Sequence, residues 1–420
     1  MRKPFWPFWL VLMFVACLPL HGSPAEPPAK ARSAASSPDT ALEFIDTSFE
    51  NASPLWYEID ANGTIQIHLN YDHERSSPNR AAGHFHFQVH ARPGSKLTLE
   101  FKNLDNVWNG RKGSIANEMK IAFLSVDGRD WTAVPTRALP GDRVLLDLRM
   151  SGAKVYVARV EPYRLSDLDR LLAAVKTALP VEITSIGKTV ERRDLEIVRI
   201  GDPKAAYRVF LRARAHPWEA GGNWVVQGLI KRLLQHDADV QKYLGRYCVY
   251  VMPMANKDGV ARGRTRFNLK GKDLNRNWDR PADPELAPEN HALETWLAAM
   301  IKNGQRPHLA LELHNDGHGQ LHISRPQRTD LKRYLARMKI LEDLLRKHTW
   351  FTEGSTGGSF GNPGTLGEGW LERYDIDAVV HEFNCHWVAG LKNYPSGKNW
   401  ELYGEQLCRV FYEYFGSEGQ

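Results

Sequence analysis

The sequence predicts two folding units in succession: an antiparallel β-sandwich domain over residues 41–162, and an α/β domain with a mixed, largely parallel sheet over residues 163–420. Short segments of the first unit alternate apolar and polar residues at period two, as strands with one buried face do. In the second unit, apolar strand-like runs alternate with longer helical stretches. The chain has 420 residues, of which 42% are hydrophobic, so it can build more than one core.

Residues 1–25 are predicted to form a signal peptide. Two basic residues precede an apolar run over 6–20, which is too short to cross a membrane, and small residues then lead to a predicted cleavage site after Ala25. Cys17 follows a small residue, so a lipid anchor at Cys17 is an open alternative. We therefore expect an exported protein, periplasmic or extracellular, without a transmembrane span.

Charge and cysteine content argue against two kinds of protein. The 55 basic residues barely outnumber the 49 acidic ones, and no Lys/Arg block is present, so a nucleic-acid partner is not expected. Beyond Cys17, three cysteines remain: Cys248, Cys385 and Cys408. An odd number cannot form a complete disulfide framework, so buried free thiols are the expected state. A single bridge between two of the three is the alternative in an exported protein, and the sequence does not choose the pair.

The first unit begins after a linker at residues 26–40, which is rich in Pro, Ala and Ser. Turn residues then separate five alternating segments, at 65–69, 84–90, 96–101, 119–124 and 144–148. His84, His86 and His90 fall on one face of a predicted strand. With no acidic or cysteine partner nearby, they are expected to face solvent rather than a metal.

The second unit opens with an amphipathic helix over 165–179 and a hairpin of strands at 181–186 and 195–200. Alternating elements follow. The predicted strands lie at 207–213, 247–253, 308–314 and 376–383, and the predicted helices at 223–234, 289–300, 330–347 and 400–415.

Candidate metal ligands stand at two predicted strand ends. His216 and Glu219 lie three residues apart between a strand and the first long helix, and His314 closes another strand. A catalytic zinc site needs three such donors and one open position. His318 and His322 are alternative donors, but both lie beyond the strand edge. The pattern therefore predicts one Zn²⁺ held by His216, Glu219 and His314.

A second group of residues has two interpretations. Glu382 is an ionisable residue in an otherwise apolar strand, which fits either a general base in a cleft or a paired structural acid. The loop 256–278 carries Arg266, Asn275 and Arg276. Arg forks and Asn amides suit the capture of a carboxylate, although a solvated basic loop has the same composition.

Together these motifs resemble the zinc metallocarboxypeptidases of the carboxypeptidase A type, especially the cytosolic carboxypeptidase branch. Each piece is weak alone, but they follow the family order over roughly residues 163–416. That branch also has a β-sandwich before its catalytic domain, so a carboxypeptidase-like fold is expected. The matching pieces are 186–195, 216–219, 256–260, 271–278, 312–314 and 381–383.

The resemblance implies a role for each matching residue. His216, Glu219 and His314 match the zinc ligands. Glu382 matches the general acid/base, which takes a proton from the zinc-activated water and returns it to the leaving amine.

Arg266 matches the arginine that polarises the scissile carbonyl, and Asn275 with Arg276 matches the pair that grips the substrate's terminal carboxylate. The implied enzyme is a metallocarboxypeptidase acting on the C-termini of peptides or proteins. An amidase for a non-peptide or cell-wall stem-peptide substrate, and an inactive metal-binding or adhesion module, remain alternatives.

Two features depart from the family pattern. The family usually has a tyrosine that closes over the substrate, and residues 348–359 contain none. Tyr374, Tyr394 and loss of this role are the alternatives, and no residue is assigned to it. The spacing from Gly357 and Gly358 to Glu382 is also longer than in the family, so the residues of the specificity pocket are not assigned. Phe360 is a weak candidate for its wall.

Overall fold

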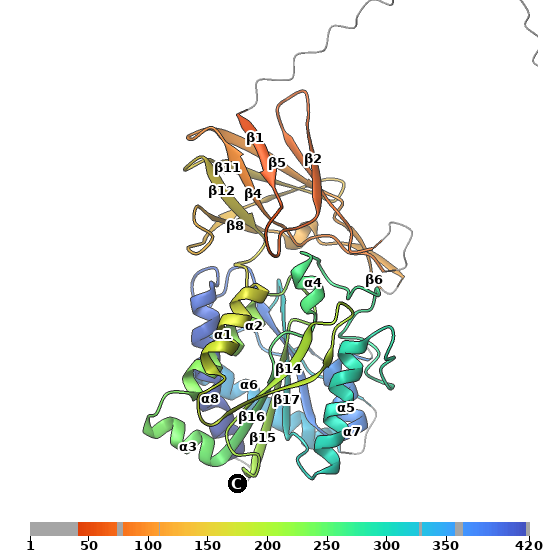
Figure 1. The fold of residues 1–420 in the computed structure, drawn as a ribbon, viewed down its shortest axis with the longest axis vertical. Helices are drawn as coiled ribbons and strands as arrows, with labels where there is room; N and C mark the ends of the chain where they lie inside the picture. The colour runs from red at the N-terminus through yellow and green to blue at the C-terminus, as the bar shows by residue number, and fades with distance from the viewer. Residues whose placement is uncertain (1–40, 74–78, 109, 327–329, 358–363, 417–420) are drawn as a thin grey trace, which may run out of the picture. The chain divides into compact units, whose positions relative to one another are not determined.

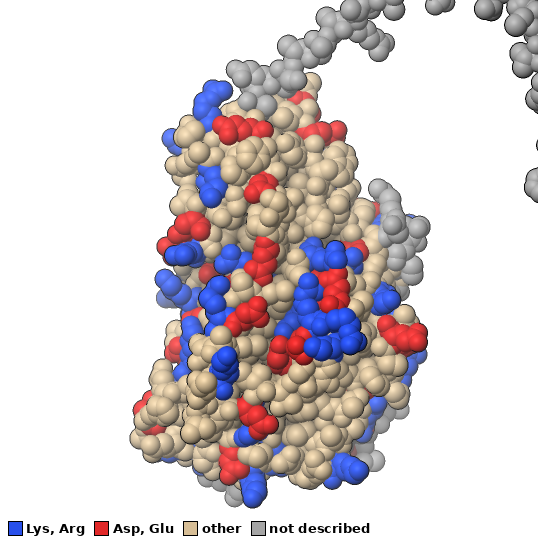
Figure 2. Space-filling view, viewed as in Figure 1, with Lys and Arg blue, Asp and Glu red and all other residues tan. Residues whose placement is uncertain are grey.

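The computed structural model describes residues 41–73, 79–108, 110–326, 330–357 and 364–416 (Figure 1). The predicted signal peptide, its Cys17, the linker and Phe360 lie outside these residues. None of the described helices is long and apolar enough to cross a membrane. Basic and acidic side chains are interspersed over the face drawn in Figure 2.

The first unit is a β-sandwich of two five-stranded sheets, as predicted. Alternate residues point inward, so Phe87 and Val89 from one sheet share a core with Leu99 and Phe101 from the other. One sheet has the order β1 (Leu42–Asp46), β4 (His86–Ala91), β12 (Lys154–Ala158), β8 (Ile121–Ser125) and β9 (Thr132–Pro135). The other has the order β10 (Arg137–Leu139), β11 (Arg143–Arg149), β5 (Lys96–Lys102), β3 (Ile65–Leu69) and β2 (Leu55–Ile59).

The pairing is antiparallel apart from β3 and β5, which run parallel. A separate two-stranded hairpin of β6 (Asp105–Trp108) and β7 (Arg111–Ser114) leads into the short helix η1 (Ala116–Glu118). This hairpin and η1 reach the candidate site described below.

The expectation that His84 and His86 face solvent is wrong. Both are buried. His84 precedes β4, and its N–H donates to Thr265 Oγ1 of the α/β unit at 3.0 Å, a contact that the period-two pattern does not reveal. The His86 ring packs against Phe49 and Trp131. Burial lowers the pKa of His84 to about 3, so its ring is neutral at pH 7.

The second unit has one mixed sheet with the order β13 (Val181–Lys188), β14 (Asp194–Ile200), β16 (Tyr247–Met252), β15 (Tyr207–Ala213), β17 (Leu309–Asp316), β19 (Asp377–Asn384) and β18 (Leu321–His322). The four strands β16, β15, β17 and β19 are parallel. The other three pairings are antiparallel, so the parallel part of the mixed sheet is its centre.

Successive residues of the central strands enter two different cores. Val209 and Leu211 of β15 point to one face, and Phe210 points to the other. The first face is covered by α1 (Leu165–Val175), α2 (Gly221–Leu233), α3 (Ala238–Arg246), α6 (Leu331–His348) and α8 (Gly397–Gly416). The opposite face is covered by α5 (Pro288–Lys302) and α7 (Leu366–Tyr374) (Figure 1).

Most predicted elements of this unit are confirmed to within a few residues, and the hairpin of β13 and β14 is antiparallel as expected. The sequence prediction missed α3, α4 (Lys257–Ala261) and α7. Cys248, Cys385 and Cys408 are buried free thiols, as expected.

Candidate metal and substrate site

The three predicted metal ligands meet at the carboxyl edge of the central strands. β15 and β17 are parallel neighbours, with Ala213 opposite Leu313. The turn that follows β15 therefore lies beside the end of β17, and ligand sites form at such strand ends. His216 and Glu219 lie in this turn, and His314 lies in β17.

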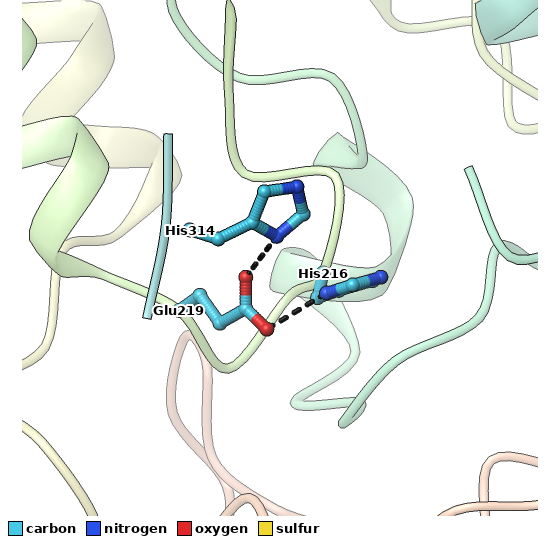
Figure 3. A group of neighbouring side chains, drawn as sticks. All are labelled: His216, Glu219 and His314. Atoms are coloured by element: carbon cyan, nitrogen blue, oxygen red, sulfur yellow. Dashed lines mark hydrogen bonds and ion pairs between the residues drawn. The ribbon is translucent and has the colours of Figure 1, made fainter. Parts of the chain in front are cut away.

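Glu219 stands between the two imidazoles. His216 Nδ1 lies 2.7 Å from one carboxylate oxygen, and His314 Nδ1 lies 2.6 Å from the other. In Figure 3 both rings turn a nitrogen toward this carboxylate. One ligand atom from each residue lies within 4.8 Å of the other two.

Two glycines let the first turn of α2 approach β17. A Cβ on Gly221 would lie 2.6 Å from Asn315 Nδ2, and one on Gly222 would lie 2.9 Å from Leu313 Cβ. Instead, the Gly221 N–H donates to Asn315 Oδ1 at 2.8 Å. A larger residue at either position would push Glu219 away from His314.

The electrostatics of this group favour a cation. Burial opposes ionisation of Glu219, but the two imidazoles outweigh it and hold the pKa of Glu219 below its usual range. Burial also opposes a charge on His314, yet the neighbouring carboxylate raises the pKa of His314 to about 10. Two imidazole nitrogens and one carboxylate are the donor types of catalytic zinc sites, so these residues fit the metal.

Outer partners orient both imidazoles. The far nitrogen of His216, Nε2, lies 3.0 Å from Asp273 Oδ1. His314 Nε2 lies 3.2 Å from Glu312 Oε1 and 3.0 Å from Asn275 Nδ2. A carboxylate hydrogen-bonded to the far nitrogen, as Asp273 is to His216, fixes the ring and raises its basicity.

Asp273 and Glu312 each also lie close to an arginine. Asp273 Oδ2 accepts from Arg266 Nε and Nη2 at 2.9 and 2.8 Å. Arg266 and His216 hold the pKa of Asp273 well below its usual range against the effect of burial. Glu312 Oε1 lies 3.6 Å from Arg212 Nε, and both residues are fully buried.

Sequence reasoning did not select Asp273, Glu312 or Arg212. Arg212 and Glu312 did carry a signal, because each is a charged residue inside an otherwise apolar strand. For Asp273, the only signal in the sequence was its place in the polar cluster at residues 273–278.

Glu382 lies beside the metal-ligand group. It sits on β19 directly opposite His314 in the parallel register, and its Oε2 has no hydrogen-bond partner among the described residues. Burial raises the pKa of Glu382 well above its ordinary value, and the nearby Asp316 carboxylate adds to the rise. A carboxylate with a free oxygen and a raised pKa is suited to accepting a proton.

His322 is not part of the ligand group. It lies with Asp316 and Glu382, whose ligand atoms are all within 4.8 Å of one another. Burial lowers the pKa of His322 to about 4. Of the three candidate histidines His314, His318 and His322, all within the described residues, the structure joins only His314 to His216 and Glu219.

The two predicted carboxylate-binding residues differ in their free hydrogen-bonding capacity. Asn275 is 3% exposed, its Nδ2 faces His314, and its Oδ1 accepts from the Leu366 N–H at 2.9 Å. Among the described residues, the Arg276 guanidinium makes one hydrogen bond, from Nη1 to the carbonyl of Asn275 at 2.7 Å. Arg276 therefore has the more available donors.

These residues share one cleft of about 650 Å³. The walls include His216, Glu219, Arg266, Asn275, Arg276 and Glu382, and also residues of the β-sandwich, namely Trp108, Arg111, Ile115, Glu118 and Arg159. No tyrosine lines the described part of the cleft. Tyr374 packs elsewhere, with its hydroxyl 3.4 Å from Glu294 Oε1, and Tyr394 packs against Trp387.

Comparison with known proteins gives a consistent result. Residues 168–308 match the family model described as zinc carboxypeptidase. Cytosolic carboxypeptidase 1 of Danio rerio is 35% identical over 112 residues, which are 27% of this chain and 10% of that protein. Cytosolic carboxypeptidase 6 of Caenorhabditis elegans is 34% identical over 123 residues, which are 28% of this chain and 27% of that one. The chain thus matches only a minor part of these relatives.

The structural likeness extends over both units. A metallo-carboxypeptidase from Burkholderia cenocepacia superposes with a TM-score of 0.78 at 20% identity, covering 90% of this chain and 100% of that one. At this identity the likeness concerns the fold. Residues 168–308 therefore resemble the zinc carboxypeptidase family in sequence, and the chain has the fold of a metallo-carboxypeptidase.

Proposed function

We propose that this protein is a zinc-dependent carboxypeptidase that hydrolyses the C-terminal peptide bond of peptides or proteins. The observation that carries the proposal is the composition of one cleft. The cleft is lined by His216 and Glu219 of the three-donor group suited to zinc, by a carboxylate with a free oxygen, and by two arginines.

His216, Glu219 and His314 are the proposed zinc ligands. A bound Zn²⁺ would supply Lewis acidity to the scissile carbonyl and lower the pKa of a water to roughly 7. Asp273 holds the far side of the His216 ring, so the nitrogen that faces Glu219 is left for the metal.

Glu382 is the proposed general base and acid. Opposite His314 on the neighbouring strand, it is placed to take a proton from the attacking water. Its raised pKa makes it a competent donor of the same proton to the leaving amine. One carboxylate can both accept and return the proton only if one of its oxygens has no other hydrogen-bond partner. Glu382 Oε2 has none among the described residues.

The two arginines divide the substrate's negative charges between them. Arg266, held by Asp273, is proposed to donate to the carbonyl oxygen as negative charge develops there. Arg276 is proposed to bind the terminal carboxylate, with Asn275 contributing only if its amide leaves His314. A requirement for a free carboxylate would make the enzyme an exopeptidase.

We also propose export, periplasmic or extracellular, on the sequence of residues 1–25 alone, with cleavage after Ala25 or lipidation at Cys17. N-terminal sequencing of the mature protein from a native host distinguishes the two, because a lipidated cysteine blocks the reaction. A mature protein that begins at Met1 contradicts export.

Removal of a metal ligand tests the zinc site. His216→Ala and His314→Ala should each lose nearly all bound zinc, because two donors remain where three are needed. The measurement is elemental analysis after dialysis. His322→Ala is the matched control and should keep zinc, since its ring lies with Asp316 and Glu382. Full zinc in both ligand variants, with loss in His322→Ala, would make the assignment wrong.

Amidation of the substrate's C-terminus tests the exopeptidase proposal. A peptide with a free carboxylate should be cleaved and its amide should not, because each lost charge-assisted hydrogen bond costs about 1.5–3 kcal/mol. Arg276→Ala should lower kcat/KM for the free peptide toward the value for the amide. Equal hydrolysis of the two peptides by the wild type contradicts the proposal and favours an amidase.

Glu382→Gln tests the base. The amide keeps the shape of the carboxylate but cannot accept the proton, so turnover should fall by at least about 10²–10⁴-fold. Zinc content and binding of a product peptide, measured by calorimetry, should stay near wild type. Unchanged turnover with full zinc would remove Glu382 from the mechanism, and loss of zinc would make it a ligand.

A further inference from the structure

The β-sandwich encloses the loop that carries Arg266. Asn51 Nδ2 donates to the Val260 carbonyl at 3.0 Å, and Asn79 Nδ2 donates to the Gly271 carbonyl at 3.3 Å. In the middle of the loop, a Cβ on Gly263 would lie 2.0 Å from the carbonyl oxygen of Ala52, and its φ is +59°. Only glycine allows this approach of the two backbones.

Asp72 makes the most concentrated of these contacts. Its carboxylate accepts three successive backbone N–H groups, from Thr265 at 2.7 Å, Arg266 at 2.6 Å and Phe267 at 3.0 Å. Asp72 is 6% exposed, and its own N–H donates to the sandwich carbonyl of Ala81 at 2.8 Å. Successive N–H groups that converge on one point form an anion-binding concavity, and Asp72 fills it.

No other partner holds these three amides in the described structure. The neighbouring amides bond within the loop or to α4, as Arg264 does to the Gly259 carbonyl at 2.9 Å. Burial raises the pKa of Asp72, and the three N–H groups act against that rise. Loss of the carboxylate would leave N–H groups in a buried loop unpaired, which destabilises this backbone conformation.

The side chain of Arg266 is held from both domains. Asp273 of the α/β domain accepts from two of its nitrogens, and the indole of Trp108 from the sandwich lies 4.9 Å from its Cζ. An arginine side chain is long and has many rotamers. The place that its guanidinium reaches therefore depends on the position of the backbone that carries it. Asp72 sets that starting point through the N–H of Arg266 itself.

We infer that Asp72 is a positioning residue for Arg266, so that the β-sandwich completes the active site of the neighbouring domain. The inference rests on the proposed function of Arg266. The contribution of the sandwich is then specific, because Asp72 fixes the backbone of residues 265–267 and Trp108 confines the guanidinium that this backbone carries into the cleft.

Asp72→Asn tests the inference. The amide oxygen cannot serve all three N–H groups, and its NH₂ would face one of them. We expect kcat to fall by on the order of 10²-fold, as for a displacement of about 1 Å, with KM within about threefold of wild type. Asn79→Ala removes a different bond between the sandwich and the same loop, and its kcat should stay within about twofold of wild type.

A double-mutant cycle separates positioning from general destabilisation. In an Arg266→Ala background, Asp72→Asn should change the residual kcat less than twofold, because the group that it positions is gone. An equal loss of kcat in both backgrounds overturns the inference. If Asp72→Asn does not fold, Asp72→Glu keeps the charge and displaces the carboxylate by one methylene, and the same cycle applies.

Hydrogen exchange gives a readout that is independent of catalysis. In Asp72→Asn, amide exchange over residues 265–267 should rise at least tenfold, with zinc content unchanged, and in Asn79→Ala it should not. Unchanged exchange overturns the inference even if kcat falls. A wild type that is zinc-loaded but inactive, with the expected exchange, would contradict the proposed function and leave the role of Asp72 in holding this loop intact.

Discussion

The parallel pairing of β15, β17 and β19 is the constraint on which the site depends. Parallel neighbours end at the same edge of a sheet, so whatever follows or closes these strands is brought together there. His216 and Glu219 follow β15, His314 lies near the end of β17, and Glu382 is its partner on β19. The register matters as much as the order, because a shift of one residue would turn Glu382 to the opposite face of the sheet. Helix α2 begins at two glycines that let it pack closely against β17. This packing keeps the turn that carries Glu219 in place.

Carboxylates link the parts of this site. Glu219 joins two imidazoles, and Asp273 joins His216 to Arg266. Each charge is thereby paired in surroundings from which water is largely excluded, where an unpaired one would be costly. As a consequence, Asp273 holds both the metal-ligand group, through His216, and Arg266, the arginine proposed to polarise the carbonyl. Disturbing Asp273 would affect both, whereas Asp72 acts on the arginine from the other side.

The sandwich is more than a neighbouring domain. Its hairpin of β6 and β7 and the helix η1 line the cleft, and its Asp72 pairs with the loop that carries Arg266. The α/β sheet supplies the proposed metal ligands, and the sandwich supplies part of the cleft wall. The requirement is a close junction, visible at Gly263, where no side chain larger than hydrogen fits.

Much of this protein follows from its sequence. Period-two alternation predicted the sandwich, and apolar runs that alternate with helical stretches predicted the α/β unit, because local periodicity shows which face of an element is buried. Polar residues at predicted strand ends predicted that His216, Glu219 and His314 converge. Helix α7 escaped because it contains Gly367 and Gly369, poor helix formers, and a Cβ on Gly369 would lie 2.2 Å from the Trp278 carbonyl oxygen. The support of Asp72 for Arg266, the burial of His84 and His86, and the partners of Asn275 were decided only by tertiary structure. Asp72 is 193 residues from Thr265 in the chain. Contacts between segments so far apart depend on how the β-sandwich packs against the α/β sheet and its loops, and no local sequence pattern records that packing.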